Sequence, residues 1–379
     1  MRRFHFAVFA RLALLVLAAQ PLVAATATYY VGTCRIAAFG TISAAVAAVP
    51  SGSIIDVCPG TYAEQVIISQ PLTLQGIFAA NSSEVLITMP RGGLATTSSI
   101  LFGTIAAQIE VTAGPVNISS LTVDGAASSN CPDESYIGIF YGSGSSGQVN
   151  EAETRNQSCN NAGFGIVAEN TAGTAQSITI ENSNVHDNTA AGITACSDQT
   201  PSTLTATIKN NYVASNLPSS LYGIWLTCNV AGTTSGNKIV GGPAGIIAAS
   251  GSNLVSGNTV TAASFGIELL ASTTVSNNTV LNATFAGILV EAPGTVSSNG
   301  IWNSSNYGIL LNVGNVLSAT VKTNTLTSSF IGIEFQCSNA ANTVIGNTMN
   351  GAVTGTDRVP ATFTGANKFN NVVTVRNGC

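Results

Sequence analysis

The sequence is poor in charged residues, aromatic residues and histidine. Only 8% of its 379 residues are charged and 6% are aromatic, and it contains 2 histidines and 2 tryptophans. A long disordered chain would be rich in charge and poor in apolar residues, whereas 45% of this chain is hydrophobic, so a folded protein is expected. The 12 basic and 17 acidic residues give a net charge of −5, which argues against nucleic acid as a partner.

Long apolar runs are also absent, apart from one near the start. Residues 1–25 begin with arginines, continue with an apolar stretch at 12–19 and end with small residues, which predicts a secretory signal peptide. An apolar run of about eight residues is too short to cross roughly 30 Å of hydrocarbon. We therefore expect no membrane span, a secreted, periplasmic or cell-surface location, and a single domain over residues 26–379.

The cysteines favour an exported protein. All of them follow residue 25, and an even number outside the cytosol is typical of a disulfide framework. A metal site would need Cys-x-x-Cys clusters or neighbouring histidines, and His186 is the only histidine after residue 25. We therefore expect disulfides and no metal site. The cysteines are Cys34, Cys58, Cys131, Cys159, Cys196, Cys228, Cys337 and Cys379.

A glycine followed by isoleucine recurs through most of the chain. The spacings run from 21 to 31 residues, and an Asn-x-aliphatic motif keeps step with the later pairs. Periods of this size are typical of a solenoid. The glycines are Gly138, Gly165, Gly192, Gly223, Gly245, Gly266, Gly287, Gly308 and Gly332, and the asparagines are Asn211, Asn237, Asn258, Asn278, Asn299, Asn324 and Asn347.

The repeat predicts stacked strands rather than helices, because it is rich in Thr, Val, Ile, Ser, Asn and Gly. A coil of about 21 residues can hold three short strands, and coils stacked about 4.8 Å apart would pair in parallel. The nine isoleucines should then form a column inside the stack. The asparagines should lie at bends, in left-handed conformations, where their amides can form a ladder.

The repeat and the opening segments resemble a known family. The segments at 40–46 (GTISAAV), 59–64 (PGTYAE) and 71–76 (PLTLQG) look like the start of the right-handed parallel β-helix proteins of the pectin-lyase-like superfamily. The resemblance covers residues 28–379 and implies an all-β solenoid of about 12 coils. It leaves the activity open, because the family includes lyases, hydrolases, epimerases, esterases and proteins with no assigned activity.

A short helix should cap the first coil on this fold. Phe39, Ile42, Val46 and Val49 have helical spacing, and Thr41 is placed to cap the helix. The cap would extend over about 36–52 and cover the open end of the core.

The expected cysteine pairs are Cys34–Cys58 beside this helix, Cys196–Cys228 on adjacent coils, Cys337–Cys379 at the tail and Cys131–Cys159 around an irregular loop.

Residues 131–198 are the chemically richest part of the sequence. They contain eight of the 17 acidic residues, and the repeat spacing is longest there, so loops should project from the stack. A site for acid–base chemistry on a sugar could combine Arg155, Glu169, His186 and Asp187, with Glu169 facing outward by alternation. The competing interpretation is an acidic surface that keeps an otherwise uncharged stack soluble.

Three aromatic residues could bind sugar rings on the outside of the stack. Trp225 lies two residues after its glycine and should face outward, and Tyr222 and Tyr307 begin equivalent strands. Aromatic side chains combine a large apolar surface with a polar tip, which suits contact with the C–H faces of sugars.

Two functions remain open. The main hypothesis is a secreted, non-catalytic β-helix that binds polysaccharide or serves as a surface scaffold. The alternative is a polysaccharide-modifying enzyme, a lyase or glycoside hydrolase of the pectin-lyase-like type, with its site in residues 131–198. Polysaccharide is the expected partner in both cases, and we expect a monomer without a cofactor. The resemblance implies calcium only if the protein is a lyase.

Overall fold

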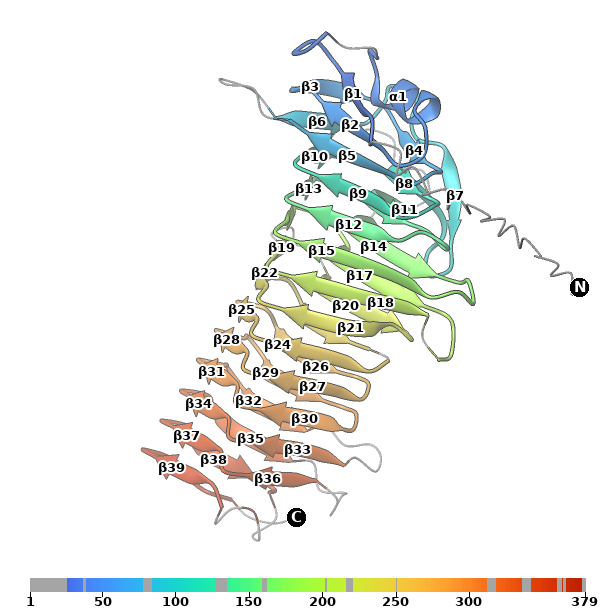
Figure 1. Ribbon diagram of the computed structural model, residues 1–379. Coiled ribbons are helices and arrows are strands. Elements are labelled where there is room, and N and C mark those ends of the chain that lie inside the picture. The colour runs from blue at the N-terminus through green and yellow to red at the C-terminus, as the bar shows by residue number, and fades with distance from the viewer. Residues whose placement is uncertain are drawn as a thin grey trace, which may run out of the picture.

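The structure, a computed structural model, describes residues 26–36, 39–77, 84–126, 135–158, 162–201, 203–215, 221–249, 251–311, 318–335, 342–359, 363 and 366–376. The chain winds into a stack of coils that runs from the N-terminal helix to the C-terminal strands (Figure 1). Each coil contributes strands to three long parallel sheets, here named A, B and C. The expected signal peptide, residues 1–25, lies outside the described residues.

Sheet A comprises thirteen strands. They are β1 (Thr28–Val31), β2 (Ser53–Val57), β5 (Leu72–Gly76), β9 (Val116–Ser119), β12 (Gly147–Asn150), β15 (Gln176–Glu181), β18 (Leu204–Lys209), β21 (Ala231–Ser235), β24 (Asn253–Ser256), β27 (Thr273–Ser276), β30 (Gly294–Ser297), β33 (Ala319–Lys322) and β36 (Thr343–Ile345).

Sheet B also comprises thirteen strands. They are β3 (Gly60–Ala63), β6 (Val85–Thr88), β10 (Thr122–Asp124), β13 (Glu153–Arg155), β16 (Asn184–His186), β19 (Tyr212–Ser215), β22 (Lys238–Gly241), β25 (Thr259–Thr261), β28 (Thr279–Leu281), β31 (Gly300–Trp302), β34 (Thr325–Thr327), β37 (Thr348–Asn350) and β39 (Lys368–Asn370).

Sheet C has twelve strands in its parallel path, and β7 (Thr96–Ser99) pairs with its strand β8 in the antiparallel sense. The twelve are β4 (Val66–Ile68), β8 (Gly103–Val111), β11 (Ser135–Tyr141), β14 (Gly163–Asn170), β17 (Ala191–Ser197), β20 (Tyr222–Cys228), β23 (Ala244–Ala248), β26 (Phe265–Leu269), β29 (Ala286–Val290), β32 (Tyr307–Leu311), β35 (Ile331–Phe335) and β38 (Thr354–Asp357). These three sheets confirm the predicted β-helix of about 12 coils.

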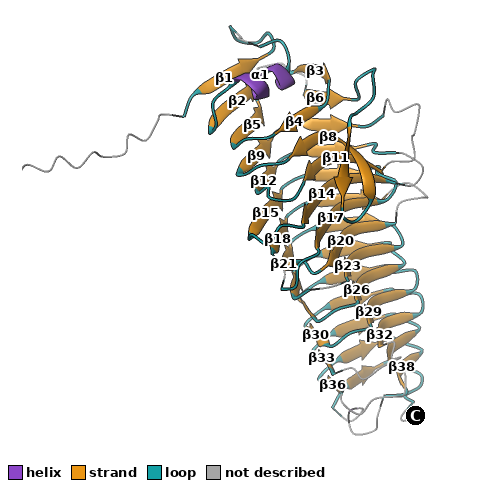
Figure 2. Ribbon diagram, turned by 90° about the vertical axis from the view of Figure 1, so that its right-hand side faces the viewer, coloured by secondary structure: helices purple, strands orange, loops and turns teal. Residues whose placement is uncertain are grey.

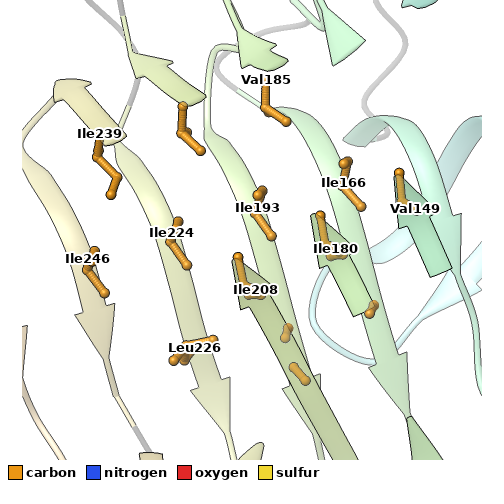
Figure 3. Close-up of a cluster of buried hydrophobic side chains, with 14 of the residues drawn as sticks. Val149, Ile166, Ile180, Val185, Ile193, Ile208, Ile224, Leu226, Ile239 and Ile246 are labelled. Carbon is orange, nitrogen blue, oxygen red and sulfur yellow. The ribbon is translucent and has the colours of Figure 1, made fainter. Parts of the chain in front are cut away.

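The predicted isoleucine column forms the interior face of sheet C. Ile267 pairs in register with Ile288, and both side chains are fully buried. Figure 3 shows the equivalent residues of earlier coils, among them Ile193 and Ile224, together with inward-facing side chains of sheet A such as Ile208. The preceding glycine is required for space, because a Cβ at Gly266 would lie 2.4 Å from the carbonyl oxygen of Gly287.

The predicted asparagine ladder lies at the bend between sheets A and B. From Asn237 onward, each amide oxygen accepts hydrogen bonds from the backbone N–H and the Nδ2 of the preceding ladder asparagine, as between Asn278 and Asn258. The expectation of left-handed ladder residues was wrong, however. The left-handed residue is the one just before, such as Asn277 (φ 57°) or Ser298 (φ 57°), because that turn aims the following side chain into the stack.

The predicted capping helix, α1 (Ile42–Ala48), covers the first coils with its buried side chains Ile42, Ala45 and Val46 (Figure 2). Thr41 caps it by accepting a hydrogen bond from Ala44 N at 3.2 Å. Phe39 does not belong to the helix; it forms an isolated bridge with Val31. No described helix has the length and apolar character that a membrane crossing requires.

Two of the expected disulfides are present. Cys34 bonds to Cys58 beside the helix, and Cys196 bonds to Cys228 across adjacent coils of sheet C. Cys131, Cys159, Cys337 and Cys379 lie outside the described residues.

Candidate functional site

A cavity of about 300 Å³ opens on the outer face of sheet C. It lies where the repeat is interrupted, because the chain between β6 and β8 forms β7, which runs beside β8 (Figure 1). The end of β7 and the turn after it form one side of the cavity, and strands β8, β11 and β14 contribute the rest. Its lining includes Ser99, Glu110, Thr112, Phe140, Glu169 and Thr171.

Two buried carboxyl groups face this cavity. Glu110 is 7% exposed and Glu169 is 2% exposed. In the register of sheet C, Glu110 pairs with Phe140 and Phe140 with Val167, so Glu169 lies two coils further on and two residues along the strand. Among the described residues, none forms a hydrogen bond or ion pair with the carboxyl group of Glu110.

Glu169 is held by the segment that follows β7. Its Oε2 accepts a hydrogen bond from Ser99 Oγ at 2.7 Å, and its Oε1 accepts one from Ile100 N at 3.2 Å. Burial raises the pKa of Glu169, assisted by the charge of Asp198, and the hydrogen bonds from Ser99 and Ile100 offset only part of this rise. A carboxyl group in this setting keeps its proton at higher pH than an exposed glutamate, as a general acid requires.

Aromatic side chains continue from the cavity along the outer face. The ring of Phe102 lies 4.1 Å from that of Phe164 and 6.5 Å from that of Trp225, measured between centroids. Tyr222 is 5.2 Å from Trp225. Both predicted sugar-binding residues are partly exposed there. Tyr307, the third one, lies several coils further on, with its ring 5.4 Å from Phe285.

A second group of charged residues forms a network on sheet B. Arg155 binds three carboxylates: Nε lies 2.8 Å from Asp124, Nη1 2.9 Å from Glu153 and Nη2 3.2 Å from Glu84. Burial alone would lower the pKa of Arg155, but Asp124 and Glu153 outweigh it and raise the pKa. A cleft of about 320 Å³, lined partly by Glu84, Glu151 and Glu153, borders the network.

His186 extends the network by one coil. Its Nε2 is 2.9 Å from Glu153 Oε1, and its Nδ1 is 2.7 Å from Asp187 Oδ2. Burial would lower the pKa of His186, but the hydrogen bonds and charges of Asp187 and Glu153 outweigh it and raise the pKa. The cation is therefore favoured, and with Arg155 it offsets part of the negative charge of the surrounding carboxylates.

The structure divides the four predicted catalytic residues between two faces. Arg155, His186 and Asp187 come together at the strands β13 and β16 of sheet B. Glu169 faces outward, as predicted, but from β14 of sheet C, and it joins Glu110 instead. Sequence analysis missed Glu110 because it lies before residue 131. The alternation Ile109-Glu110-Val111 within an apolar strand is the signal that could have found it.

The pocket does not fit a calcium ion. Its two carboxyl groups come from strands two coils apart, and no group of three or more His, Cys, Asp or Glu side chains in the described part of the chain could hold a metal.

Comparison with known proteins supports the fold. Residues 173–348 match the family described as "Right handed beta helix region". A search of curated proteins by sequence found no match. Among solved structures, the A-module of the mannuronan C-5 epimerase AlgE6 of Azotobacter vinelandii is similar, with a TM-score of 0.62 and 16% identity over 88% of this chain and 94% of that chain.

Two further structures share the architecture. A lacto-N-biosidase of Eubacterium ramulus matches with a TM-score of 0.61 and 12% identity, over 85% of this chain and 67% of that chain. A PL6 alginate lyase matches with a TM-score of 0.59 and 13% identity, over 93% of this chain and 84% of that chain. At these identities the similarity shows the fold alone: the chain is a right-handed parallel β-helix that resembles the repeat proteins of the pectin-lyase-like superfamily.

Proposed function

We propose that the protein is a polysaccharide-modifying enzyme, and specifically a glycoside hydrolase, with its active site in the sheet C pocket. The observation that carries the proposal is the pair of buried carboxyl groups, Glu110 and Glu169, facing one cavity. Glycoside hydrolases typically use two carboxyl groups on either side of the scissile bond. The pocket lining includes no Lys, Arg or His, which makes it poorly suited to a lyase with a basic residue as its base.

Glu169 has the environment of the general acid. Its raised pKa lets it hold a proton and deliver it to the glycosidic oxygen as the bond from that oxygen to the anomeric carbon breaks. Glu110 is the second group, and its carboxylate would take a proton from the attacking water. The new carbon–oxygen bond then forms between that water and the anomeric carbon, so that water is added across the glycosidic bond.

The register suggests the stereochemical outcome. Two strand spacings across the sheet, about 9.6 Å, and two residues along the strand, about 6.6 Å, place the backbones of the two glutamates about 12 Å apart. Both side chains reach into the same cavity, and a backbone separation of this size suits the wider carboxyl spacing of inverting hydrolases, about 6.5–9.5 Å, which leaves room for a water molecule between substrate and base. We therefore expect inversion at the anomeric carbon.

The proposal adopts the enzyme alternative in place of the scaffold hypothesis. It is supported by the proteins with similar folds, since the mannuronan epimerase, the lacto-N-biosidase and the alginate lyase all act on carbohydrates. The expected signal peptide and the disulfides Cys34–Cys58 and Cys196–Cys228 support activity outside the cytosol.

The test is product analysis by mass spectrometry and NMR. The purified protein, beginning at residue 26, is incubated with a panel of neutral and acidic polysaccharides. We expect new saturated oligosaccharides with wild type, a loss of at least about 100-fold in rate with Glu110→Gln and Glu169→Gln, and unchanged activity with Asp56→Asn on sheet A. Circular dichroism melts check that each variant is folded.

Three results would contradict the proposal. Unsaturated products would identify a lyase. Loss of activity in Asp187→Asn, with full activity in both pocket variants, would place the site on sheet B. Intact substrates throughout, with measurable binding to one of them, would restore the scaffold hypothesis.

A further inference from the structure

Along strands β8 to β32, the outer face of sheet C carries acidic residues without basic ones. Of the nine lysines and arginines that follow residue 25, none lies in the ten strands from β8 to β35 of this sheet. The same ten strands contain four glutamates: Glu110, Glu169, Glu268 and Glu334. The sheet B network, by contrast, contains Arg155 and His186. At the C-terminal end of the sheet Arg358, which follows β38 (Thr354–Asp357), lies 3.7 Å from Glu334. A chain lying along strands β8 to β32 therefore meets hydrogen-bond acceptors and carboxyl groups, but no Lys or Arg of those strands.

Aromatic residues recur on this face at every second coil. At the position that begins each strand, the register runs from Phe164 through Ala191 to Tyr222, and then through Ala244 to Phe265 and Ala286 to Tyr307. Two coil spacings are about 9.6 Å, which is comparable to the length of an extended disaccharide. Aromatic and small residues thus alternate from coil to coil. The aromatic spacing matches the repeat of a polymer in which every second sugar presents the same face.

The aromatic residues of this face, here called the aromatic strip, form two groups of rings. In the first, Phe102 and Phe164 belong to one apolar cluster with Phe140 of the pocket lining, and Trp225 and Tyr222 follow. Phe285 then joins Phe265 to Tyr307, with ring centroids 5.1 Å and 5.4 Å apart. These later rings are partly exposed and pack over the outward-facing Leu289 and Leu310. The strip is therefore fixed in place by packing and needs little reordering to bind a ligand.

We infer that the protein binds an uncharged linear polysaccharide along the helix axis, with the cleavage pocket at one end and every second sugar against the aromatic strip. The inference rests on the proposed function and adds the substrate class. A uronic-acid polymer would bring one carboxylate per sugar to a stretch of the sheet, β8 to β32, whose strands contain no Lys or Arg to pair with it, and the carboxylate of Glu110 would repel it. A neutral sugar instead donates its hydroxyl hydrogens to such carboxylates and places its C–H face on the rings.

The test measures binding separately from catalysis. The Glu110→Gln variant is titrated calorimetrically with oligosaccharides of increasing length, prepared from neutral β-linked glucans, mannans and xylans and from alginate and polygalacturonate. We expect binding to one neutral series, with affinity rising until the chain spans the strip, and no binding of the uronate series. Affinity should change little with salt, because no ion pair with the polymer is formed.

Variants of the strip test its periodicity. Replacing Tyr307 or Phe265 by Ala should weaken binding of long oligosaccharides about tenfold, which corresponds to roughly 1.4 kcal/mol, and leave binding of the shortest bound oligosaccharide unchanged. Leu254→Ala, on the exposed side of sheet A, is the matched control and should change neither. If a strip variant fails to fold, the dependence of affinity on oligosaccharide length in the Glu110→Gln protein still tests the role of the strip.

The outcomes separate this inference from the proposed function. Binding of a neutral series without turnover by wild type would overturn the hydrolase proposal and leave the inference standing. Cleavage of a uronate polymer at the pocket would do the opposite. Affinity that does not increase with chain length would contradict the role of the strip, as would self-association of the protein through this face that the oligosaccharides do not reverse.

Discussion

Replacing one ladder asparagine by alanine removes only a few atoms, but it should lower the free energy of unfolding of the whole stack by several kcal/mol. Asn278 makes four hydrogen bonds inside the bend. Its Oδ1 accepts from the backbone N and the Nδ2 of Asn258 at 2.9 and 3.0 Å. Its Nδ2 donates to the carbonyl oxygen of Val255 and to Asn299 Oδ1, both at 3.0 Å.

The magnitude follows from which partners are left without a bond. The Nδ2 of Asn258 keeps its bond to the carbonyl oxygen of Thr234, and Asn299 Oδ1 still accepts from the backbone N–H at position 278. The backbone N–H of Asn258 loses its acceptor in a buried site, which costs about 1–3 kcal/mol, and each of the other three lost bonds contributes about 0.5–1.5 kcal/mol. We expect a total loss of about 5 kcal/mol in the free energy of unfolding.

Denaturant unfolding measures the loss of global stability, and amide hydrogen exchange measures the effect on single backbone amides. Asn278→Ala should lower the free energy of unfolding, whereas Asn117→Ala, exposed on β9, should change it by less than about 0.5 kcal/mol. Within the variant, the amide of Asn258 should exchange faster, while that of Asn299 keeps its acceptor, Asn324. A loss below about 1 kcal/mol, or equal acceleration of both amides, would refute the reasoning.

Three further predictions test the interior, the sheet B network and the outer face. Ile267→Asp should unfold the protein by burying an unpaired charge in the column, whereas Thr274→Asp on the exposed side of β27 should leave the thermal melt nearly unchanged. His186 should titrate by NMR above its ordinary pKa of 6.5, with Asp187→Asn lowering the midpoint; its contribution to stability is present below pH 6.5 and is lost as the pH rises through the folded-state pKa. Burial and the neighbouring Glu291 raise the pKa of Glu268 from 4.5 to about 7, so wild type should lose stability as the pH rises from 4.5 to 7. Glu268→Gln should then be the more stable protein at pH 8 and show no advantage at pH 4.

The fold could be predicted because the repeat encodes it redundantly. Each coil repeats the same pattern of inward and outward side chains. The isoleucine column could therefore be predicted from the spacing of the glycines and the alternation of side chains along a strand. The cap was predictable for a similar reason, since Ile42 and Val46 share one helical face and Thr41 precedes them. The left-handed residue was misplaced by one position because the sequence shows an asparagine at the bend but not which backbone torsion turns the chain.

The candidate site was less predictable because it depends on which sheet each strand joins. Arg155 and Glu169 are 14 positions apart in the sequence, and the corner between β13 and β14 sends them to different faces. Ser99 contacts Glu169 across 70 positions, through a segment that does not follow the repeat. No periodicity could indicate that contact, and Glu110 looks like an ordinary outward-facing strand residue until β7 lies beside it.

The position of the pocket follows from the way a uniform parallel stack is built. When every coil has the same length, each outward side chain lies about 4.8 Å from its equivalents above and below, and the face is flush. A cavity therefore requires an irregular insertion, and β7 supplies one between β6 and β8. The later coils lack such an insertion in their described strands, and their regularity is what spaces the aromatic residues evenly. Irregular coils that hold the carboxyl groups and regular coils that hold evenly spaced aromatic residues thus follow from one structural rule, and the proposed cleavage of a long chain at one point would use both.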